Sequence, residues 1–494
     1  MALARRKFIL LVSATTIALF LVYVPFFLHL DGLTLRIWDE ARMASNSLHM
    51  YLTGQLLVPH FEGRPDMWCT KPPVLLWLQL GFMKMLGIGE VALRLPSAVS
   101  GLFICVLLIY MSRNELHTYY PGILATLILA TSAGFVGWHG VRTGDYDILL
   151  SFSTLFYLYQ FYLYLSEYDP RKMSKYLYAF LGGVVLAFWV KGIAALVFLP
   201  ALVPFIAIRK PQEFRSMRFW VACLTTGLLA ISYYFLRESV NPGYLKAVYE
   251  NEIGGRLLDA VEGHGHPFGY YISALPSRLG GWIWFFLPAA AYLMFFGTGK
   301  EPLISALFTS AVVWYLLVMS AAQTKLPWYD IPTYPLIAFI TSLGIFRIFN
   351  DFLFKIHLKK YLIPIMILFI IGATFRPYST MYDTVFKPKE YSWDRDYYRL
   401  TYFLRDKIRN EEKLEDHILV DTIYCAHNKF YMNWMNHEGS SIDFAHRMKY
   451  IVPGKKYIIH QSNVDDFIQT RFRYRLLEED HNVKRYEILG RKDQ

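Results

Sequence analysis

Two adjacent acids, Asp39 and Glu40, follow the first apolar run of the chain and begin a polar stretch that also contains Arg42. A carboxylate at this position could accept a proton from an attacking hydroxyl group and act as a general base. An arginine beside it could bind phosphate oxygens through paired hydrogen bonds. The alternative is structural, because both acids could interact with the positive end of a helix that begins there.

Four further stretches combine charged residues with glycine or proline. Their cations could surround a phosphate or diphosphate, and cations that hold a leaving phosphate stabilise the charge that develops on it. Arg42 and Lys71 could instead extend to lipid head groups. The stretches are Cys69 to Pro73, Arg142 to Asp147, Lys191 with Gly192, and Lys325 to Tyr329, and a longer loop over 237–279 adds Asn251, Glu252, Arg256, His264 and His266.

Asp145 and Asp147 are further candidate catalytic acids, although either could be a solvated turn residue. His264 and His266 are as consistent with turn or hydrogen-bonding roles as with metal binding. Neither an HExxH pattern nor a pair of closely spaced cysteines supports a metal site. The sequence therefore leaves the identity and the presence of a metal unknown.

Membrane helices must position these residues. Hydrophobic residues make up 55% of the chain and charged residues only 18%, whereas soluble domains contain about 25% charged residues. The net charge of +11 could indicate nucleic-acid binding, but the basic residues fall between apolar segments, where lipid head groups and membrane topology explain them better. We therefore expect the lipid bilayer, and no nucleic acid, as a partner.

Eleven apolar segments have about the length of a membrane span. A further run over 73–86 is short for a span, and we predict an interfacial helix there, inside a long first outer loop. The first apolar run lacks a small-residue cleavage site, so we expect it to remain as an anchor. The predicted spans are 8–30, 92–111, 121–138, 148–166, 176–190, 192–208, 218–236, 281–297, 302–320, 330–348 and 360–375.

Loop charge orients these spans. Basic residues concentrate in alternate loops, which are therefore predicted to be cytoplasmic together with the N-terminus. The polar stretches, from Asp39 onward, then share the outer face of the membrane. The basic residues of the predicted inner loops are Arg113, Arg171, Lys172, Lys175, Arg209, Lys210, Arg215, Arg218, Lys300, Arg347, Lys355, Lys359 and Lys360.

The residues after the last span change in character. We predict a transmembrane domain over 1–375 and a charged outer domain over 376–494. Periodicity indicates a helix over 397–408 and strands over 417–424, 456–460 and 485–489. The predicted fold is an all-α polytopic membrane domain followed by a small α/β domain, which serves as a structural or acceptor-positioning cap. Cys69 and Cys425 would share its oxidising compartment, so a disulfide between them stays open.

The order of the motifs resembles that of bacterial GT-C glycosyltransferases related to protein O-mannosyltransferases and to the aminoarabinose transferase that modifies lipid A. The similarity covers about residues 1–350. It implies a multi-pass protein of the bacterial inner membrane, a polyprenyl-phosphate (undecaprenyl-phosphate) sugar donor, and an acceptor on the periplasmic face. Protein hydroxyls, lipid A and envelope glycans all remain open as acceptors, and we expect a monomer. The motifs are Asp39 to Arg42, Thr70 to Pro73, Arg142 to Leu150, Val190 to Leu196, and Lys325 to Tyr329.

The resemblance also implies roles for individual residues. Asp39 would be the catalytic base or orient the acceptor, and Asp147 would be the second catalytic aspartate, with Asp145 as the alternative. Glu40 is expected to be a structural support rather than a chemical group. The implied donor-phosphate ligands are Arg42, Lys71, Arg256, Lys191 and Tyr329, and the implied acceptor or supporting residues are Glu40, Glu252, His264 and Lys325.

The chain departs from these relatives at one position that binds metal. Aminoarabinose transferases have a metal-binding glutamate where this chain has Thr70, and their histidine ligand aligns near Glu252, with His264 close in sequence. Metal dependence and the lipid A acceptor therefore both stay open.

We expect direct displacement at the sugar, which inverts the configuration of the anomeric carbon. The main alternative is a transporter of lipids or lipid-linked sugars. Transporters often contain inverted repeats and a midplane site, whereas this sequence has no convincing repeat and its polar stretches share one face. A non-enzymatic scaffold for envelope polysaccharide assembly would not need so many acids and bases together.

Overall fold

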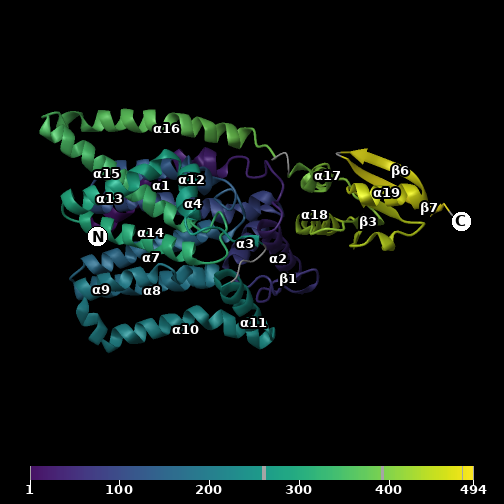
Figure 1. The fold of residues 1–494 in the computed structure, drawn as a ribbon, viewed down its shortest axis with the longest axis horizontal. Helices are drawn as coiled ribbons and strands as arrows, with labels where there is room; N and C mark the ends of the chain where they lie inside the picture. The colour runs from purple at the N-terminus through teal and green to yellow at the C-terminus, as the bar shows by residue number, and fades with distance from the viewer. Residues whose placement is uncertain (1, 259–262, 391–393, 481, 493–494) are drawn as a thin grey trace.

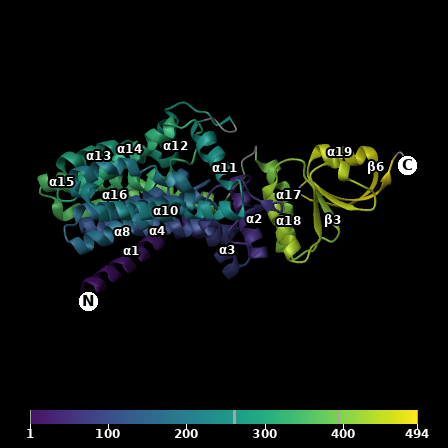
Figure 2. The same cartoon turned by 90° about the horizontal axis from the view of Figure 1, so that it is seen from below.

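The computed structural model describes residues 2–258, 263–390, 394–480 and 482–492. Long helices form a bundle, and a smaller part with a β-sheet lies at one end of it (Figure 1). A second view, turned by 90°, shows the N-terminus at the end of the bundle that is far from the sheet (Figure 2). The expected combination of a helical membrane domain and a small C-terminal α/β domain is confirmed.

Within the described residues, nine apolar helical segments are long enough to cross a membrane. Each overlaps a predicted span, and one of them begins at Tyr270, inside the loop predicted over 237–279. An apolar helix of this length satisfies its own backbone hydrogen bonds in lipid. The segments are α1 (Ala2–Phe27), α4 (Glu90–Leu116), α7 (Tyr146–Ser166), α8 (Pro170–Lys191), α10 (Met217–Val240), α12 with α13 (Tyr270–Leu279 and Ile283–Phe296), α14 (Glu301–Ala321), α15 (Tyr334–Lys355) and α16 (Leu362–Phe386).

Two of the eleven expected spans are shorter than predicted. The segment over 121–138 contains α5 (Tyr120–Ala130) and the four-residue α6 (Ala133–Val136), with a break at Thr131 and Ser132. The segment over 192–208 is divided into η1 (Gly192–Leu196), η2 (Leu199–Leu202) and α9 (Val203–Arg209). Prolines that cannot donate a helical hydrogen bond lie in η2 and α9, which accounts for that division.

The first loop of the bundle contains α2 (Asp39–Thr53), a hairpin of β1 (His60–Phe61) and β2 (Arg64–Pro65), and α3 (Val74–Leu86). The 13-residue α3 coincides with the predicted interfacial helix and is short of a span. A second long loop contains α11 (Tyr244–Val248) and the π-helix η4 (Tyr249–Leu258). The remaining short helices are η3 (Pro211–Arg215), η6 (Gly280–Trp282), η7 (Ile331–Thr333), η8 (Lys359–Tyr361) and η9 (Met448–Tyr450).

The C-terminal part, from α17 onward, is here called the tail domain. Its sheet has the order β4-β3-β5-β7-β6, in which β3 is parallel to β4 and β5, and β7 is antiparallel to β5 and β6. The predicted helix and three strands match α17, β3, β5 and β7, whereas α18, β4, α19 and β6 were not predicted. The elements are α17 (Arg395–Arg409), β3 (His417–Val420), α18 (Ala426–His437), β4 (Ile442–Ala445), β5 (Lys456–Ile459), α19 (Ser462–Arg471), β6 (Phe472–Asp480) and β7 (Val483–Arg491).

The two parts of the molecule share a hydrophobic core. Leu48 of α2 and Leu93 of α4 belong to the same buried cluster as Leu404 of α17 and Phe430 of α18. The last long helix, α16, continues to Phe386, past the predicted boundary at residue 375. Cys69 and Cys425 are both buried free thiols, and no disulfide joins them.

Candidate active site

Polar residues from five separated segments line one pocket. Asp39 comes from the start of α2, Lys71 from the loop before α3, and Asp147 from the first turn of α7; the other polar residues of the wall are Asp145, Lys191 and Tyr329. Figure 1 places α2, α3 and α11 at the end of the bundle next to the tail domain. The fold therefore brings together stretches that the sequence predicted to share one face of the membrane.

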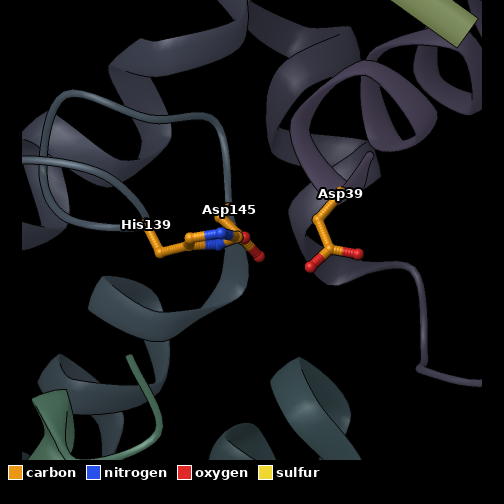
Figure 3. A group of neighbouring side chains, drawn as sticks. All are labelled: Asp39, His139 and Asp145. Atoms are coloured by element: carbon orange, nitrogen blue, oxygen red, sulfur yellow. The ribbon is translucent and has the colours of Figure 1, made fainter. Parts of the chain in front are cut away.

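Asp39 is the first residue of α2 and is half-buried in the pocket wall. The described residues give its carboxylate neither a hydrogen bond nor an ion pair. The side chain faces His139 and Asp145 across the pocket (Figure 3). An unpartnered carboxylate at a pocket wall can accept a proton from a bound hydroxyl group.

Glu40, the next residue, points away from the pocket into a fully satisfied buried network. Its oxygens accept bonds from Arg94 Nε at 2.7 Å and Arg94 Nη2 at 2.9 Å, from the Arg36 amide at 2.7 Å and from the Gly144 amide at 2.9 Å. Burial alone would raise the pKa of Glu40, but Arg94 and the two amides lower it overall. Glu40 thus ties the start of α2 to α4 and to the loop before α7.

His139 and Asp145 form a buried ion pair opposite Asp39. The imidazole Nδ1 of His139 contacts one carboxylate oxygen of Asp145, and the other oxygen accepts the Tyr146 amide at 2.6 Å. The ring of His139 stacks on Trp328 with centroids 3.4 Å apart. Burial favours neutral forms, but the pair outweighs it, so the pKa of His139 is raised and that of Asp145 is lowered.

Asp147 and Lys191 form a second buried pair, between the first turn of α7 and the last residue of α8. One Asp147 oxygen contacts Lys191, and the other has no hydrogen-bond partner among the described residues. The ammonium group also lies 5.3 Å from the centroid of the Tyr329 ring. The α8 helix ends directly after Lys191 because Gly192 adopts a positive φ of 57°, and this break presents the lysine to the pocket.

Lys71 belongs to a third charged group. Its ammonium lies 3.4 Å from Glu252, whose same oxygen accepts the Thr70 hydroxyl at 2.6 Å. Two hydrogen bonds to its backbone fix the loop that carries Thr70 and Lys71. Tyr244 donates to the Thr70 carbonyl at 2.7 Å, and Arg237 donates to the Cys69 carbonyl at 2.7 Å. The loop therefore holds Lys71 in place at the pocket.

An apolar groove continues from this pocket. The two share Lys71, Asp147, Lys191 and Tyr329 in their walls. Most of the other lining side chains are apolar, among them Leu150, Ile193, Val197, Ile253, Val318 and Met319, and Glu252 and Thr324 also line the groove. The cavity thus joins a charged end to a hydrophobic channel, which is the arrangement that a lipid with a charged head group requires.

Several predicted site residues lie outside this pocket. The Nε and Nη2 atoms of Arg42 donate to Asp66, at 2.9 and 2.7 Å, and Lys325 donates to the Ala322 carbonyl at 2.6 Å. His264 pairs through its carbonyl with the Lys325 amide at 2.9 Å, and its side chain does not line the pocket. The side chain of Arg256 lies outside the described residues.

A cation could bind at one place among the described residues. Ligand atoms of Asp39, His139 and Asp145 all lie within 4.8 Å of one another (Figure 3), and two carboxylates with an imidazole are a suitable donor set for a divalent metal. The position of Thr70, where the resemblance implied a metal-binding glutamate, is different. Thr70 there is bonded to Glu252, next to the ammonium of Lys71, so this group does not fit a divalent cation.

Sequence reasoning missed three residues that organise the site. Arg94 was counted within an apolar span, although an arginine in such a segment is itself a signal of function or pairing. His139 was overlooked because the span over 121–138 was predicted to end one residue before it. Asp66, which holds Arg42, lies in a loop that carried no recognised motif.

Comparisons with known proteins agree with this geometry. Residues 70–235 match the dolichyl-phosphate-mannose-protein mannosyltransferase family. An uncharacterised protein of Aquifex aeolicus is 28% identical over 65% of this chain and 60% of its own length. The undecaprenyl phosphate-alpha-4-amino-4-deoxy-L-arabinose arabinosyl transferase of Edwardsiella ictaluri is 26% identical over 66% of this chain. The match spans 58% of that transferase, so less than two thirds of either relative is covered.

Solved structures extend the similarity to the whole fold. ArnT from Cupriavidus metallidurans, bound to undecaprenyl phosphate, superposes with a TM-score of 0.71 over 96% of this chain and 97% of that protein, at 13% identity. The archaeal oligosaccharyltransferase AglB of Archaeoglobus fulgidus, in complex with dolichol-phosphate, gives a TM-score of 0.53 over 86% of this chain and 63% of its own, at 12% identity. By sequence the chain is thus similar to the dolichyl-phosphate-mannose-protein mannosyltransferase family and to an aminoarabinose transferase, and it has the fold of ArnT.

Proposed function

We propose that this membrane glycosyltransferase moves a single sugar from a polyprenyl-phosphate donor, undecaprenyl phosphate in bacteria, to an acceptor hydroxyl on the periplasmic face of the inner membrane. The continuity of the charged pocket with the apolar groove carries this proposal. In this proposal the polyprenyl chain lies in the groove and its phosphate lies between Lys71, Lys191 and Tyr329, which line both cavities. The undecaprenyl phosphate bound to ArnT from C. metallidurans, which has the same fold, supports this choice of lipid.

The proposed reaction is a direct displacement at the anomeric carbon. Asp39 takes the proton from the acceptor hydroxyl, and the hydroxyl oxygen forms the new bond to the sugar. The bond between the sugar and the phosphate oxygen breaks, and its electron pair leaves with the lipid phosphate. Such a displacement inverts the configuration of the anomeric carbon.

The cations have their effect on the leaving group. Lys71 and Lys191 are each held by an acid, Glu252 and Asp147, before any donor binds. Fixed positive charge near the phosphate stabilises the transition state more than the ground state, because negative charge grows there as the bond breaks. A divalent cation held by Asp39, His139 and Asp145 would supply further Lewis-acid stabilisation of that charge.

The acceptor is proposed only by class. Protein hydroxyls, lipid A and envelope glycans each offer a hydroxyl group on the periplasmic side. The pocket has charged and aromatic walls, and neither feature selects one of these acceptors over the others.

A reconstituted assay tests the proposal. The purified protein in proteoliposomes receives undecaprenyl phosphate carrying a labelled sugar, together with an envelope extract of the host. We expect label in a new product and an equal amount of free undecaprenyl phosphate, and mass spectrometry of the product identifies the acceptor. Movement of intact labelled lipid across the bilayer, without release of lipid phosphate, would instead establish a transporter.

A further inference from the structure

We infer that the tail domain is a working part of the active site: its tyrosines hold the backbone that precedes Asp39 and so position this carboxylate. The inference rests on the proposed function, in which Asp39 is the base. It assigns a positioning role to Tyr398, Tyr424 and Tyr431, none of which lines the pocket. The contacts that carry it lie in residues 35–38, directly before α2.

Two tyrosine hydroxyl groups of the tail domain accept bonds from this segment. The Leu35 amide donates to Tyr431 of α18 at 3.2 Å, and the Ile37 amide donates to Tyr398 of α17 at 3.1 Å. Both tyrosine side chains are buried, with at most 1% exposed. A buried amide without a partner is costly, so these bonds fix alternate residues of the segment to the tail domain.

Trp38, which lies between Ile37 and Asp39, has a strained backbone. Trp38 has φ 73° and ψ −117°, a conformation that residues with a Cβ atom rarely adopt. Its side chain stacks on Tyr424 of the tail domain, with ring centroids 4.5 Å apart and an interplanar angle of 11°. The stacking holds Trp38 in the conformation that directs Asp39 toward the pocket.

An ion pair and a shared core reinforce this attachment. Arg36 forms two hydrogen bonds, at 2.5 and 2.8 Å, to Glu390, which precedes the tail domain and accepts a hydrogen bond from Tyr402 of α17. The Arg36 guanidinium also lies 4.0 Å from the centroid of the Tyr398 ring. Leu35 is buried in one cluster with Phe403 and Phe430 of the tail domain. The segment before Asp39 is thus packed into the tail domain, and Glu40 fixes the start of α2 to the membrane bundle.

Kinetics of two substitutions at Tyr424 test the positioning role. Tyr424→Ala removes the ring that stacks on Trp38, and Tyr424→Phe keeps it. Because small displacements of a catalytic group are costly, we expect Tyr424→Ala to lower kcat about tenfold or more. The donor KM stays unchanged, since the proposed phosphate ligands lie elsewhere in the pocket wall. Tyr424→Phe retains most of the activity, as does the control Tyr450→Ala, which removes an exposed tyrosine elsewhere in the tail domain.

A second readout does not depend on sugar transfer. Hydrogen–deuterium exchange, followed by mass spectrometry, reports on the amides of a peptide that covers residues 34–43. We expect faster exchange in Tyr424→Ala than in Tyr424→Phe or Tyr450→Ala, with the peptides of α7 and α8 unchanged. Unchanged exchange in Tyr424→Ala, or a full kcat with a raised donor KM, would overturn the inference. If the native protein transfers no sugar, the exchange measurement still decides whether the tail domain holds this segment.

Discussion

The two faces of the α2 N-terminus differ in how completely their acids are paired. On the inner face, Glu40 accepts four hydrogen bonds and is neutralised by Arg94. On the pocket face, the carboxylate of Asp39 has neither a hydrogen bond nor an ion pair to a described residue, and one oxygen of Asp147 accepts no hydrogen bond. The hydrogen bonds of Glu40 thus fix the pocket wall, whereas the acceptor oxygens of Asp39 and Asp147 stay available where substrates would bind.

Asp39 and Glu40 are adjacent carboxylic acids, but this difference in pairing gives them different roles. A buried acid with a complete set of partners contributes to stability and geometry, and its loss is expected to affect folding. A partly exposed acid without partners contributes little to folding, and its loss is expected to affect the reaction. Substitutions on the inner face should therefore lower stability, and substitutions on the pocket face should lower the rate of sugar transfer.

The largest effect is expected on the inner face. Arg94→Ala leaves Glu40 buried without its counter-charge, and breaking such a buried pair costs about 3–5 kcal/mol. We expect little folded protein in membranes, as measured by detergent-resistant yield and thermal unfolding. The matched control, Arg171→Ala, removes an exposed arginine and should leave both unchanged. Normal stability of Arg94→Ala would show that the Arg94–Glu40 pair on the inner face does not stabilise the fold.

A smaller effect is expected for the cations of the pocket. Lys71→Ala removes a charge from the proposed phosphate site, and we expect kcat/KM for the donor to fall about tenfold to a hundredfold. Lys325→Ala is the comparison, because Lys325 is buried but donates to the Ala322 carbonyl outside the pocket. Its effect should appear in stability and leave the donor KM of the folded protein unchanged. Unaltered donor kinetics in Lys71→Ala would remove Lys71 from the phosphate site.

The smallest effect is a pH dependence of stability at the His139–Asp145 pair. The pKa of His139 is raised, so its stabilising charge is present below about pH 6.5 and is lost as the pH rises through the raised value. The pKa of Asp145 is lowered, so its contribution is present above about pH 4 and is lost at lower pH. Unfolding of His139→Gln should therefore differ most from the native protein between these limits. A difference that grows as the pH rises above about 6.5 would contradict this assignment.

The sequence predicted those parts of the molecule that depend on the pattern of apolar runs and of loop charge along the chain. Apolar runs located nine long helical segments, and loop charge grouped the polar stretches that the structure brings together. Lys191 was recognised because an unpaired lysine between apolar segments is costly, and its partner proved to be Asp147.

The parts that depend on pairing between distant residues were not predictable. Nothing in the local sequence shows that Arg42 is held by Asp66 or that Arg94 is held against Glu40. The broken segment after Lys191 was read as one span, because its apolar composition hides the effect of its prolines. The tail domain carried no recognised motif, and its contact with residues 35–38 depends on packing between segments more than 350 residues apart.

The most direct test compares Asp39→Asn with Glu40→Gln in the same membranes, by measuring transfer rate and unfolding temperature together. We expect Asp39→Asn to lose transfer by about a hundredfold or more, with an unfolding temperature equal to that of the native protein. Glu40→Gln should lower the unfolding temperature, because Arg94 loses its buried counter-charge. Near-native transfer by Asp39→Asn, or a loss of stability at Asp39 in place of Glu40, would contradict the account.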